Sequence, residues 1–348
     1  MWRWYFSLLE NSQRYGIAWW IQKLLLVFSL FYQAGIRLRL LGYRWGVLNI
    51  YRVPIKVVSV GNLTAGGTGK TPFVEWLAKA LQKFLPSDYI CLLSRGYKQL
   101  DSGVNDEYLL LQQNLPSIAH FTGKDRVALA KTAYEQGYRL AILDDGFQHI
   151  RLQRDLNILL LDATNPFGYG KCLPAGLLRE PMYAIQRADV VILTRVELCP
   201  PTSLAQLEET VLTYKALPIF WLKFSLRRCY ELFRGTAYTL DSLPPLFAFC
   251  AIGNPRSFLL LLEHYQITPL GCQIYPDHHI YSQKDLDKLI QQAQRAGAKG
   301  LLTTQKDAVK IQFLRSSFPV YVFELEADLV KGEETFQSIL RSLCSSDR

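Results

Sequence analysis

Short, uninterrupted apolar runs, separated by amphipathic or polar stretches, recur along most of this 348-residue chain. A continuous apolar run of about 4 to 8 residues is typical of a strand buried on both faces of a parallel sheet. Such runs, each followed by polar residues, occur at 55–60, 89–93, 140–143, 156–161 and 190–193. The alternation predicts an α/β fold whose first sheet is parallel, with helices on both faces and ligands at its carboxyl edge.

The second half of the chain has a different pattern. Residues 219–225 and 232–238 are expected to form a pair of extended strands that links two lobes. A capping box at Ser282 and Asp285 starts a later helix. Further apolar runs occur at 246–252, 300–303 and 320–323. Together these features predict a second, smaller α/β unit.

A glycine-rich turn follows the first apolar run, and residues 55–75 read IKVVSVGNLTAGGTGKTPFVE. Glycines let backbone N–H groups turn onto phosphate oxygens where a Cβ would block the approach. The N-terminus of the next helix adds a partial positive charge. Lys70 can reach the β- and γ-phosphates, and the Thr71 hydroxyl can ligate Mg²⁺. The residues predicted to contact the nucleotide are Thr64, Ala65, Gly66, Gly67, Thr68, Gly69, Lys70 and Thr71.

One position of this loop departs from the general pattern G-x-x-x-x-G-K-[ST], because Thr64 stands where the first glycine is usual. A purely structural glycine turn is the competing interpretation. The context favours a nucleotide loop, since an apolar strand precedes it and a helix with Pro72 in its first turn follows. We therefore predict a P-loop that binds ATP.

The net charge of +9 is a local feature of the N-terminus. Residues 1–56 hold eight Lys and Arg side chains and one acid, so this segment supplies +7 and the other 292 residues only +2. The remainder has no stripe of basic and aromatic residues, which argues against nucleic acid as a partner.

The same N-terminal segment carries five of the seven tryptophans: Trp2, Trp4, Trp19, Trp20 and Trp45. Its apolar run, 24–36, is 13 residues long, whereas a spanning helix needs about 20. Trp, Lys and Arg favour the membrane–water interface and anionic head groups. We expect a helix within residues 1–45 that docks on the cytoplasmic leaflet. A helix packed on the core or on an oligomer partner, and a true single span, are the alternatives.

Composition restricts the class of protein further. A hydrophobic content of 49% with 20% charged residues excludes a disordered chain. The seven cysteines are scattered, with no C-x-x-C pair. This usage fits reduced thiols in a cytoplasmic protein better than a disulfide framework or a zinc site.

Two adjacent carboxylates, Asp144 and Asp145, follow the apolar run 140–143. A Walker-B-type carboxylate that holds Mg²⁺ or its water lies at such a position. Successive strand residues point to opposite sides, so both can act only if the backbone turns, which Gly146 permits. The alternative is that one of them caps the next turn.

A second acidic pair, Asp106 and Glu107, is expected in a short polar link before a strand-like run at 108–111. Acidic pairs in loops are usually solvated, so this pair is ambiguous on its own. A helix is expected from about residue 125 to 136, ahead of the strand that leads to Asp144.

Two further polar groups are candidate site residues. Asp277, His278 and His279 are consecutive in the second half, and a histidine beside an aspartate can polarise a hydroxyl because its pKa lies near neutrality. A surface loop is the alternative there. Arg179 and Glu180 offer a cation for phosphate and a carboxylate, and are also ambiguous alone.

Two other classes of function compete with a kinase. A membrane-anchored P-loop GTPase or regulatory ATPase is suggested by T-Q-K-D at 304–307, although a guanine-reading loop would have N-K-x-D. A non-enzymatic binder that uses the basic N-terminus is the other. Nucleotide preference and lipid-dependent ATP consumption separate these possibilities.

Taken together, these stretches resemble the tetraacyldisaccharide 4′-kinase family, the lipid A kinases of Gram-negative bacteria. That family's loop also carries threonine at the position of Thr64. The matching blocks run along nearly the whole chain: VGNLTAGGTGKTP (60–72), LSRGY (93–97), NDE (105–107), DDGFQH (144–149), FGYGKCLPAGLLREP (167–181), AIGNPRSF (251–258), PDHH (276–279) and TTQKDAVK (303–310).

The resemblance implies ATP- and Mg²⁺-dependent phosphorylation of the 4′-hydroxyl of a tetraacylated glucosamine disaccharide 1-phosphate. It also implies a two-lobed α/β fold with a short β linker, and an N-terminal helix that docks on the cytoplasmic face of the inner membrane. The sequence leaves the oligomeric state open, with a monomer favoured. The expected division is 1–45 for the membrane helix, 46–217 for the P-loop domain, 218–240 for the linker and 241–348 for the second lobe.

The resemblance also implies roles for individual residues. Asp106 matches the family's catalytic base and His278 its partner, while Lys70 and Arg179 would neutralise charge on the γ-phosphoryl group. The residues implied to be catalytic are Asp106, His278, Lys70, Asp145 and Arg179. Those implied to lie near the metal are Thr71, Asp144, Asp145, Gln148, Glu107 and Glu180.

Overall fold

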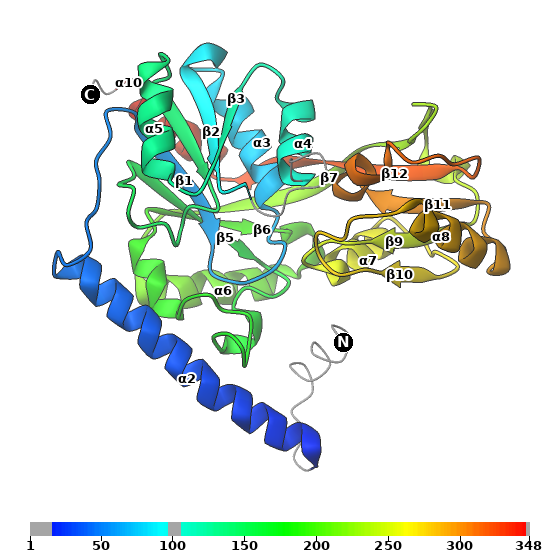
Figure 1. Ribbon diagram of the computed structural model, residues 1–348, viewed down its shortest axis with the longest axis horizontal. Helices are drawn as coiled ribbons and strands as arrows, with labels where there is room; N and C mark the ends of the chain where they lie inside the picture. The colour runs from blue at the N-terminus through cyan, green and yellow to red at the C-terminus, as the bar shows by residue number, and fades with distance from the viewer. Residues whose placement is uncertain (1–15, 97–105, 346–348) are drawn as a thin grey trace.

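One continuous twelve-stranded sheet joins two lobes in the computed structural model, which describes residues 16–96 and 106–345 (Figure 1). The strand order is β10-β9-β11-β12-β7-β6-β5-β1-β4-β2-β3, and β8 pairs with β7 outside this path. Trp2 and Trp4 of the predicted membrane segment lie outside the described residues.

The first lobe is built on a parallel sheet with β1 at its centre. Val58 of β1 pairs with Ile142 on one side and with Leu156 on the other, so β1 lies between β4 and β5. The predicted strands are confirmed, and β3 was not predicted. The strands are β1 (Lys56–Asn62), β2 (Ile90–Ser94), β3 (Ala119–Thr122), β4 (Leu140–Asp144), β5 (Leu156–Asp162) and β6 (Val190–Thr194).

Helices cover both faces of this sheet, because alternate residues of each strand point to opposite sides. Val58 of β1 packs in the core under α3 and α10, whereas Val57 packs under α5. The helix predicted at 125–136 is confirmed as α5, with Asp125 as its N-cap. The helices are α3 (Lys70–Leu81), α4 (Asp106–Asn114), α5 (Arg126–Glu135), α6 (Pro201–Tyr214) and α10 (Glu333–Ser345).

The second lobe is a smaller α/β layer. Helix α8 covers one face of its sheet and α7 the other, and the predicted capping box of Ser282 and Asp285 starts α8. The elements of this lobe are β9 (Leu246–Cys250), α7 (Pro255–His264), β10 (Cys272–Ile274), α8 (Gln283–Arg295), β11 (Gly300–Thr304) and α9 (Gln305–Ile311).

Two long antiparallel strands, β7 (Ile219–Glu231) and β12 (Val320–Lys331), cross from one lobe to the other (Figure 1). β7 pairs with β6 at its start, and β12 pairs with β11 at its start. The expected pair of strands within 219–238 is therefore wrong. Its first member is longer than expected, its partner is β12, and only the two-residue β8 (Ala237–Tyr238) forms from the second.

Two more expectations do not hold. Residues 108–111 belong to helix α4 and do not form a strand. The acidic side chains of Asp106 and Glu107 favour the N-terminal end of a helix, which carries a partial positive charge. Leu110 and Leu111 of this helix are buried. The C-terminal helix α10, expected in the second lobe, returns to the first, where Phe336 packs against Phe73 with ring centroids 6.5 Å apart.

The N-terminal helix α2 (Ile17–Arg44) runs along the outside of the first lobe (Figure 1). Only a narrow side of this helix contacts the first lobe. There, Ser29 is buried and donates a hydrogen bond to the carbonyl of Cys172 at 2.8 Å. The opposite side exposes Trp20, Leu24, Val27, Phe28, Phe31 and Leu38. The helix therefore contacts the core along one side only and is not buried in it. By length and composition α2 could cross a membrane, which the 13-residue run had not suggested.

Candidate active site

A cleft of about 980 Å³ between the two lobes is lined by almost all of the residues predicted to act on a nucleotide. The P-loop forms its floor, and the second lobe contributes segments 252–254, 277–278 and 304–306. Tyr32 and Arg39 of α2 line it too, so the cleft extends from the phosphate loop to the N-terminal helix.

The P-loop has the backbone that a phosphate cradle requires. Gly69 is the N-cap of α3 and has a φ of +81°, and a Cβ there would lie 2.5 Å from the Phe224 ring. Gly66 has a φ of +122°. The Thr194 hydroxyl of β6 donates to the Thr68 carbonyl at 2.9 Å and fixes the loop to the next strand. The loop is therefore held open by positions that only glycine fills without strain.

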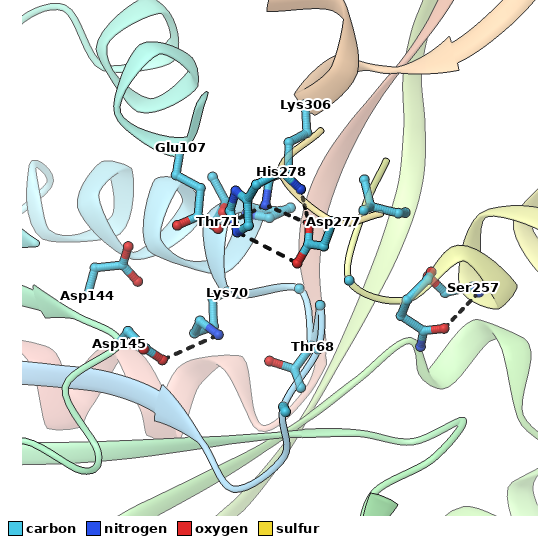
Figure 2. Close-up of a pocket in the computed structure, with 18 of the residues that line it drawn as sticks. Thr68, Lys70, Thr71, Glu107, Asp144, Asp145, Ser257, Asp277, His278 and Lys306 are labelled. Atoms are coloured by element: carbon cyan, nitrogen blue, oxygen red, sulfur yellow. Dashed lines mark hydrogen bonds and ion pairs between the residues drawn. The ribbon is translucent and has the colours of Figure 1, made fainter. Parts of the chain in front are cut away.

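Lys70 projects from the first turn of α3 into the cleft (Figure 2). Its Nζ donates to Asn62 Oδ1 at 3.1 Å and lies 3.4 Å from Asp145 Oδ1. Thr71 follows it in the same turn. The amine is thus held beside the loop, where phosphate oxygens can replace the carboxylate as its partner.

The two carboxylates at the end of β4, Asp144 in its last position and Asp145 directly after it, both lie at the cleft, since the backbone turns as expected. Asp145 adopts a left-handed φ of +51°, and the N–H of Gly146 donates to the Val60 carbonyl at 2.9 Å. Burial, and next to it the negative charge of Glu107, raise the pKa of Asp144 to about 7. The Oδ1 atom of Asp144 is buried without a hydrogen-bond partner among the described residues. The charges of Lys70 and Arg126 oppose this rise in the pKa but do not cancel it.

The residues present fit a magnesium ion that is held mainly by nucleotide phosphates. Among residues 16–96 and 106–345, no three His, Cys, Asp or Glu side chains converge into a closed metal site. Mg²⁺ in kinases needs only one or two carboxylates besides water and phosphate. Asp144 Oδ1 and Gln148 Oε1 are buried oxygens without partners in the described part of the chain. Figure 2 places Thr71, Glu107 and Asp144 around the same space.

Arg179 and Glu180 are adjacent in the chain but contact different partners. Arg179 Nη1 donates to both carboxylate oxygens of Asp145 at 2.9 Å. Burial alone would raise the pKa of Asp145, but Lys70 and Arg179 lower it well below its usual range. Glu180 is buried and forms an ion pair with Arg187. Its place beside the metal stays a prediction, and Arg187 is the cation it contacts here.

Asp106 and His278 come from different lobes and form a direct pair. His278 Nδ1 lies 2.9 Å from Asp106 Oδ1 and 3.1 Å from Oδ2. The Asp106 side chain is 4% exposed and that of His278 24%, so the histidine faces the cleft and the aspartate lies behind it. Burial alone would raise the pKa of Asp106, but the hydrogen bond with His278 and the charges of Lys306 and Lys310 lower it well below its usual range.

The neighbours of His278 have unlike roles. Asp277 lies beside it in the cleft, with Oδ2 3.6 Å from His278 Nε2 (Figure 2). His279 points elsewhere, stacks on Tyr275 with centroids 4.5 Å apart, and approaches Asp285 of α8 at 3.4 Å. The three consecutive polar residues therefore divide into two at the site and one that packs within the second lobe.

Sequence reasoning missed two lysines of α9. Lys306 Nζ lies 3.0 Å from Glu107 Oε1 and 3.9 Å from Asp106 Oδ2, and Lys310 Nζ also lies 3.9 Å from Asp106 Oδ2. Lys306 belongs to the T-Q-K-D segment at 304–307, whose resemblance to a guanine-reading loop drew attention away from the lysine itself. Thr304 is instead the N-cap of α9, and its hydroxyl accepts the N–H of Asp307.

A second contact between the lobes, at the P-loop, was also missed. Asn254 Nδ2 of the second lobe donates to Asp162 Oδ2 of β5 at 2.9 Å. The backbone at Gly253 lies against Gly66 and Gly67, since a Cβ on Gly253 would be 2.5 Å from the Gly67 nitrogen. The AIGNPRSF segment therefore forms the opposite wall of the phosphate loop.

Comparison with known proteins agrees with this geometry. The family model for tetraacyldisaccharide-1-P 4′-kinase matches residues 21–345. The tetraacyldisaccharide 4′-kinases of Syntrophus aciditrophicus and Anaeromyxobacter sp. are 35% and 34% identical, over 91% and 95% of this chain and 91% and 94% of theirs. The crystal structure of LpxK from Aquifex aeolicus in complex with ATP superposes with a TM-score of 0.70 at 30% identity and covers 93% of this chain and 99% of that one.

Proposed function

Since this chain belongs to the tetraacyldisaccharide-1-phosphate 4′-kinase family, it is an ATP-dependent lipid kinase, and we propose that the cleft between its lobes is where both substrates meet. It transfers the γ-phosphoryl group to the 4′-hydroxyl of a tetraacylated disaccharide 1-phosphate, a step of lipid A biosynthesis. One observation supports the location above all. The P-loop lysine of one lobe and the Asp106–His278 pair, completed by the other lobe, flank the same cavity.

We propose that the nucleotide phosphates lie over Gly66 to Lys70. Backbone N–H groups of the loop and the N-terminus of α3 favour phosphate charge at this point. Lys70 exchanges Asp145 for the β- and γ-phosphates, and Arg179 then balances the charge of Asp145. Thr71 and Asp144 are the residues that would hold Mg²⁺, which would supply positive charge against the charge of the transferred group.

The proton of the sugar hydroxyl goes to the Asp106–His278 pair. A secondary alcohol ionises far too weakly to react unaided, and an ordered acceptor removes its proton as the bond to phosphorus forms. The lowered pKa of Asp106 keeps this carboxylate ionised at neutral pH. A weak base is adequate here because phosphoryl transfer passes through a loose transition state, in which positioning of the nucleophile contributes most.

We propose that the acylated acceptor enters from the side of α2. Tyr32, Ile36 and Arg39 of this helix line the far end of the cleft. The outer side of α2 exposes Phe28 and Phe31, and a helix with such a face binds at a bilayer surface. The protein would thus bind its lipid at the cytoplasmic face of the inner membrane without withdrawing the acyl chains into water.

The deciding experiment measures transfer of labelled γ-phosphate from ATP to a tetraacylated disaccharide 1-phosphate in mixed micelles. We expect lipid-dependent transfer that EDTA abolishes and Mg²⁺ restores. The variant Lys70→Met should lower kcat by about 10³-fold or more, since it removes a charge that acts on the transferred group. Retained activity of Lys70→Met, or label that appears only as free phosphate when the lipid is present, would contradict the proposal.

A further inference from the structure

Lys306 connects acidic side chains of both lobes. Its Nζ lies 3.0 Å from Glu107 Oε1 and 3.9 Å from Asp106 Oδ2, both on α4 of the first lobe. It also lies 3.8 Å from Asp277 Oδ1 of the second lobe. Figure 2 shows Lys306 above Asp277 and His278, with Glu107 to one side. One cation therefore touches three carboxylates around the proposed proton acceptor.

The helix that carries Lys306 is firmly fixed in the second lobe. Asp307, fully buried, accepts from the Ala251 N–H and from the Tyr281 and Thr304 hydroxyls at 2.8 to 3.2 Å. Lys310, one turn after Lys306 and 1% exposed, lies 2.7 Å from Asp307 Oδ1. Since these bonds fix α9 to the residue after β9 and to the segment before α8, Lys306 moves with the second lobe.

Lys306 pairs with all three carboxylates, whereas Lys310, which is also 3.9 Å from Asp106, lies closer to Asp307 at 2.7 Å. Asp106, Glu107 and Asp277 repel one another, and partial burial strengthens that repulsion. Burial alone would lower the pKa of Lys306, but Glu107, Asp106 and Asp277 raise it, so the amine stays charged. A neutral side chain in its place would leave the repulsion of Glu107 and Asp277 uncompensated and weaken the hold of the start of α4 on His278.

We infer that Lys306 is a positioning residue, which holds the Asp106-bearing end of α4 against His278 and so assembles the proton acceptor only when the lobes are together. This inference rests on the proposed function. Lys306 acts through Asp106 and does not itself bind the nucleotide. A direct contact of Lys306 with the transferred phosphate is the competing role.

The first test is steady-state kinetics of Lys306→Gln, with Lys288→Gln as the matched control because Lys288 is an exposed lysine on α8 of the same lobe. Lys306→Gln should lower kcat by about 10²-fold, the lower end of what a general base supplies. Its KM for ATP should change by less than about threefold. Lys306→Arg should recover most of kcat, and Lys288→Gln should match the parent.

The second test combines Lys306→Gln with Asp106→Asn. Residues that act as a unit are not additive, so Lys306→Gln should cost less than about threefold once Asp106 is already neutral. The inference is wrong if the two losses multiply, or if the KM for ATP rises as much as kcat falls, since both results indicate direct phosphate binding. It is also wrong if Lys306→Gln has parental kcat.

Failure of the inference is distinguishable from failure of the proposed function. If the parent protein shows no lipid-dependent phosphate transfer, the proposed function itself is wrong. If the parent is active, and Lys306→Gln shows a cooperative thermal transition and equal activity, only the role inferred for Lys306 is wrong. Because the Lys306 side chain is 18% exposed at the cleft, the neutral variant is expected to fold.

Discussion

The P-loop and the proton-acceptor cluster lie in one cleft but are built in opposite ways. The loop occupies residues 64–71, between β1 and α3, and residues that are consecutive in the chain form it. The cluster collects Asp106 from α4, His278 from a turn and Lys306 from α9, across 200 residues and two lobes. Local sequence is therefore sufficient for the nucleotide side, whereas the acceptor side depends on how the lobes meet.

This difference separates binding from chemistry. Contacts of the loop with Asn62 and Thr194 lie within the first lobe, and the second lobe adds only the backbone at Gly253 as a wall against Gly66 and Gly67. The pair of Asp106 and His278 exists only across the junction. Changes in the cluster should therefore act on kcat, and changes in the glycine backbone of the loop on nucleotide affinity, whereas the charge of Lys70 acts on the transferred group.

The largest effect is expected at the cluster. Asp106→Asn and His278→Gln should each lower kcat by about two to four orders of magnitude, the range of general-base catalysis, with ATP affinity nearly unchanged. Steady-state transfer and equilibrium nucleotide binding measure the two quantities. His279→Gln is the matched control, because His279 stacks on Tyr275 away from the cleft. The contrast between the loop and the cluster is wrong if His279→Gln lowers kcat as much as His278→Gln does, or if the affinity for ATP falls together with kcat.

A smaller effect is expected at the loop. Gly69→Ala places a Cβ 2.5 Å from Phe224 and holds alanine at a φ of +81°. A left-handed backbone costs about 1–2 kcal/mol for a residue with a Cβ, equivalent to roughly 5- to 30-fold in affinity for ATP. Nucleotide titration measures this loss, while kcat at saturating ATP should stay within about threefold.

Gly137→Ala is the control for backbone strain alone. Gly137 has a φ of +101°, and no atom lies within 4 Å of an added Cβ. It follows α5, outside the cleft, so this variant should lower thermal stability without weakening ATP binding. Equal loss of ATP affinity in both variants would show that general destabilisation, and not the loop, is responsible.

The same contrast explains what the sequence could predict. The strands of the first lobe other than β3, the loop and the turn at Asp145 follow from apolar runs and glycines that are adjacent in the chain. The contacts of Lys306 and Asn254 could not be foreseen, since both cross between the lobes. The sequence predicts a strand at 108–111 because three consecutive leucines obscure the helical periodicity. In the structure these residues form a helix, which packs against α3 and α9.

The smallest effect on catalysis is expected from substitutions on the outer side of α2, because these side chains contact neither the loop nor the cluster. The triple variant Leu24→Ser, Phe28→Ser and Phe31→Ser removes exposed apolar side chains and leaves the inner contacts of Ser29, Tyr32 and Arg39 in place.

Each buried apolar side chain contributes about 1.5–3 kcal/mol, so partitioning of the triple variant to anionic vesicles should fall by at least about 10²-fold. Its kcat with acceptor in micelles should stay within about threefold, because Tyr32 still donates to the Arg179 carbonyl at 3.0 Å. Leu212→Ser, an exposed leucine of α6, is the control for general surface polarity. Unchanged vesicle binding would exclude this face as the membrane contact. A large loss of kcat in micelles would mean that α2 belongs to the catalytic assembly, and that the acceptor side extends over a third segment of the chain.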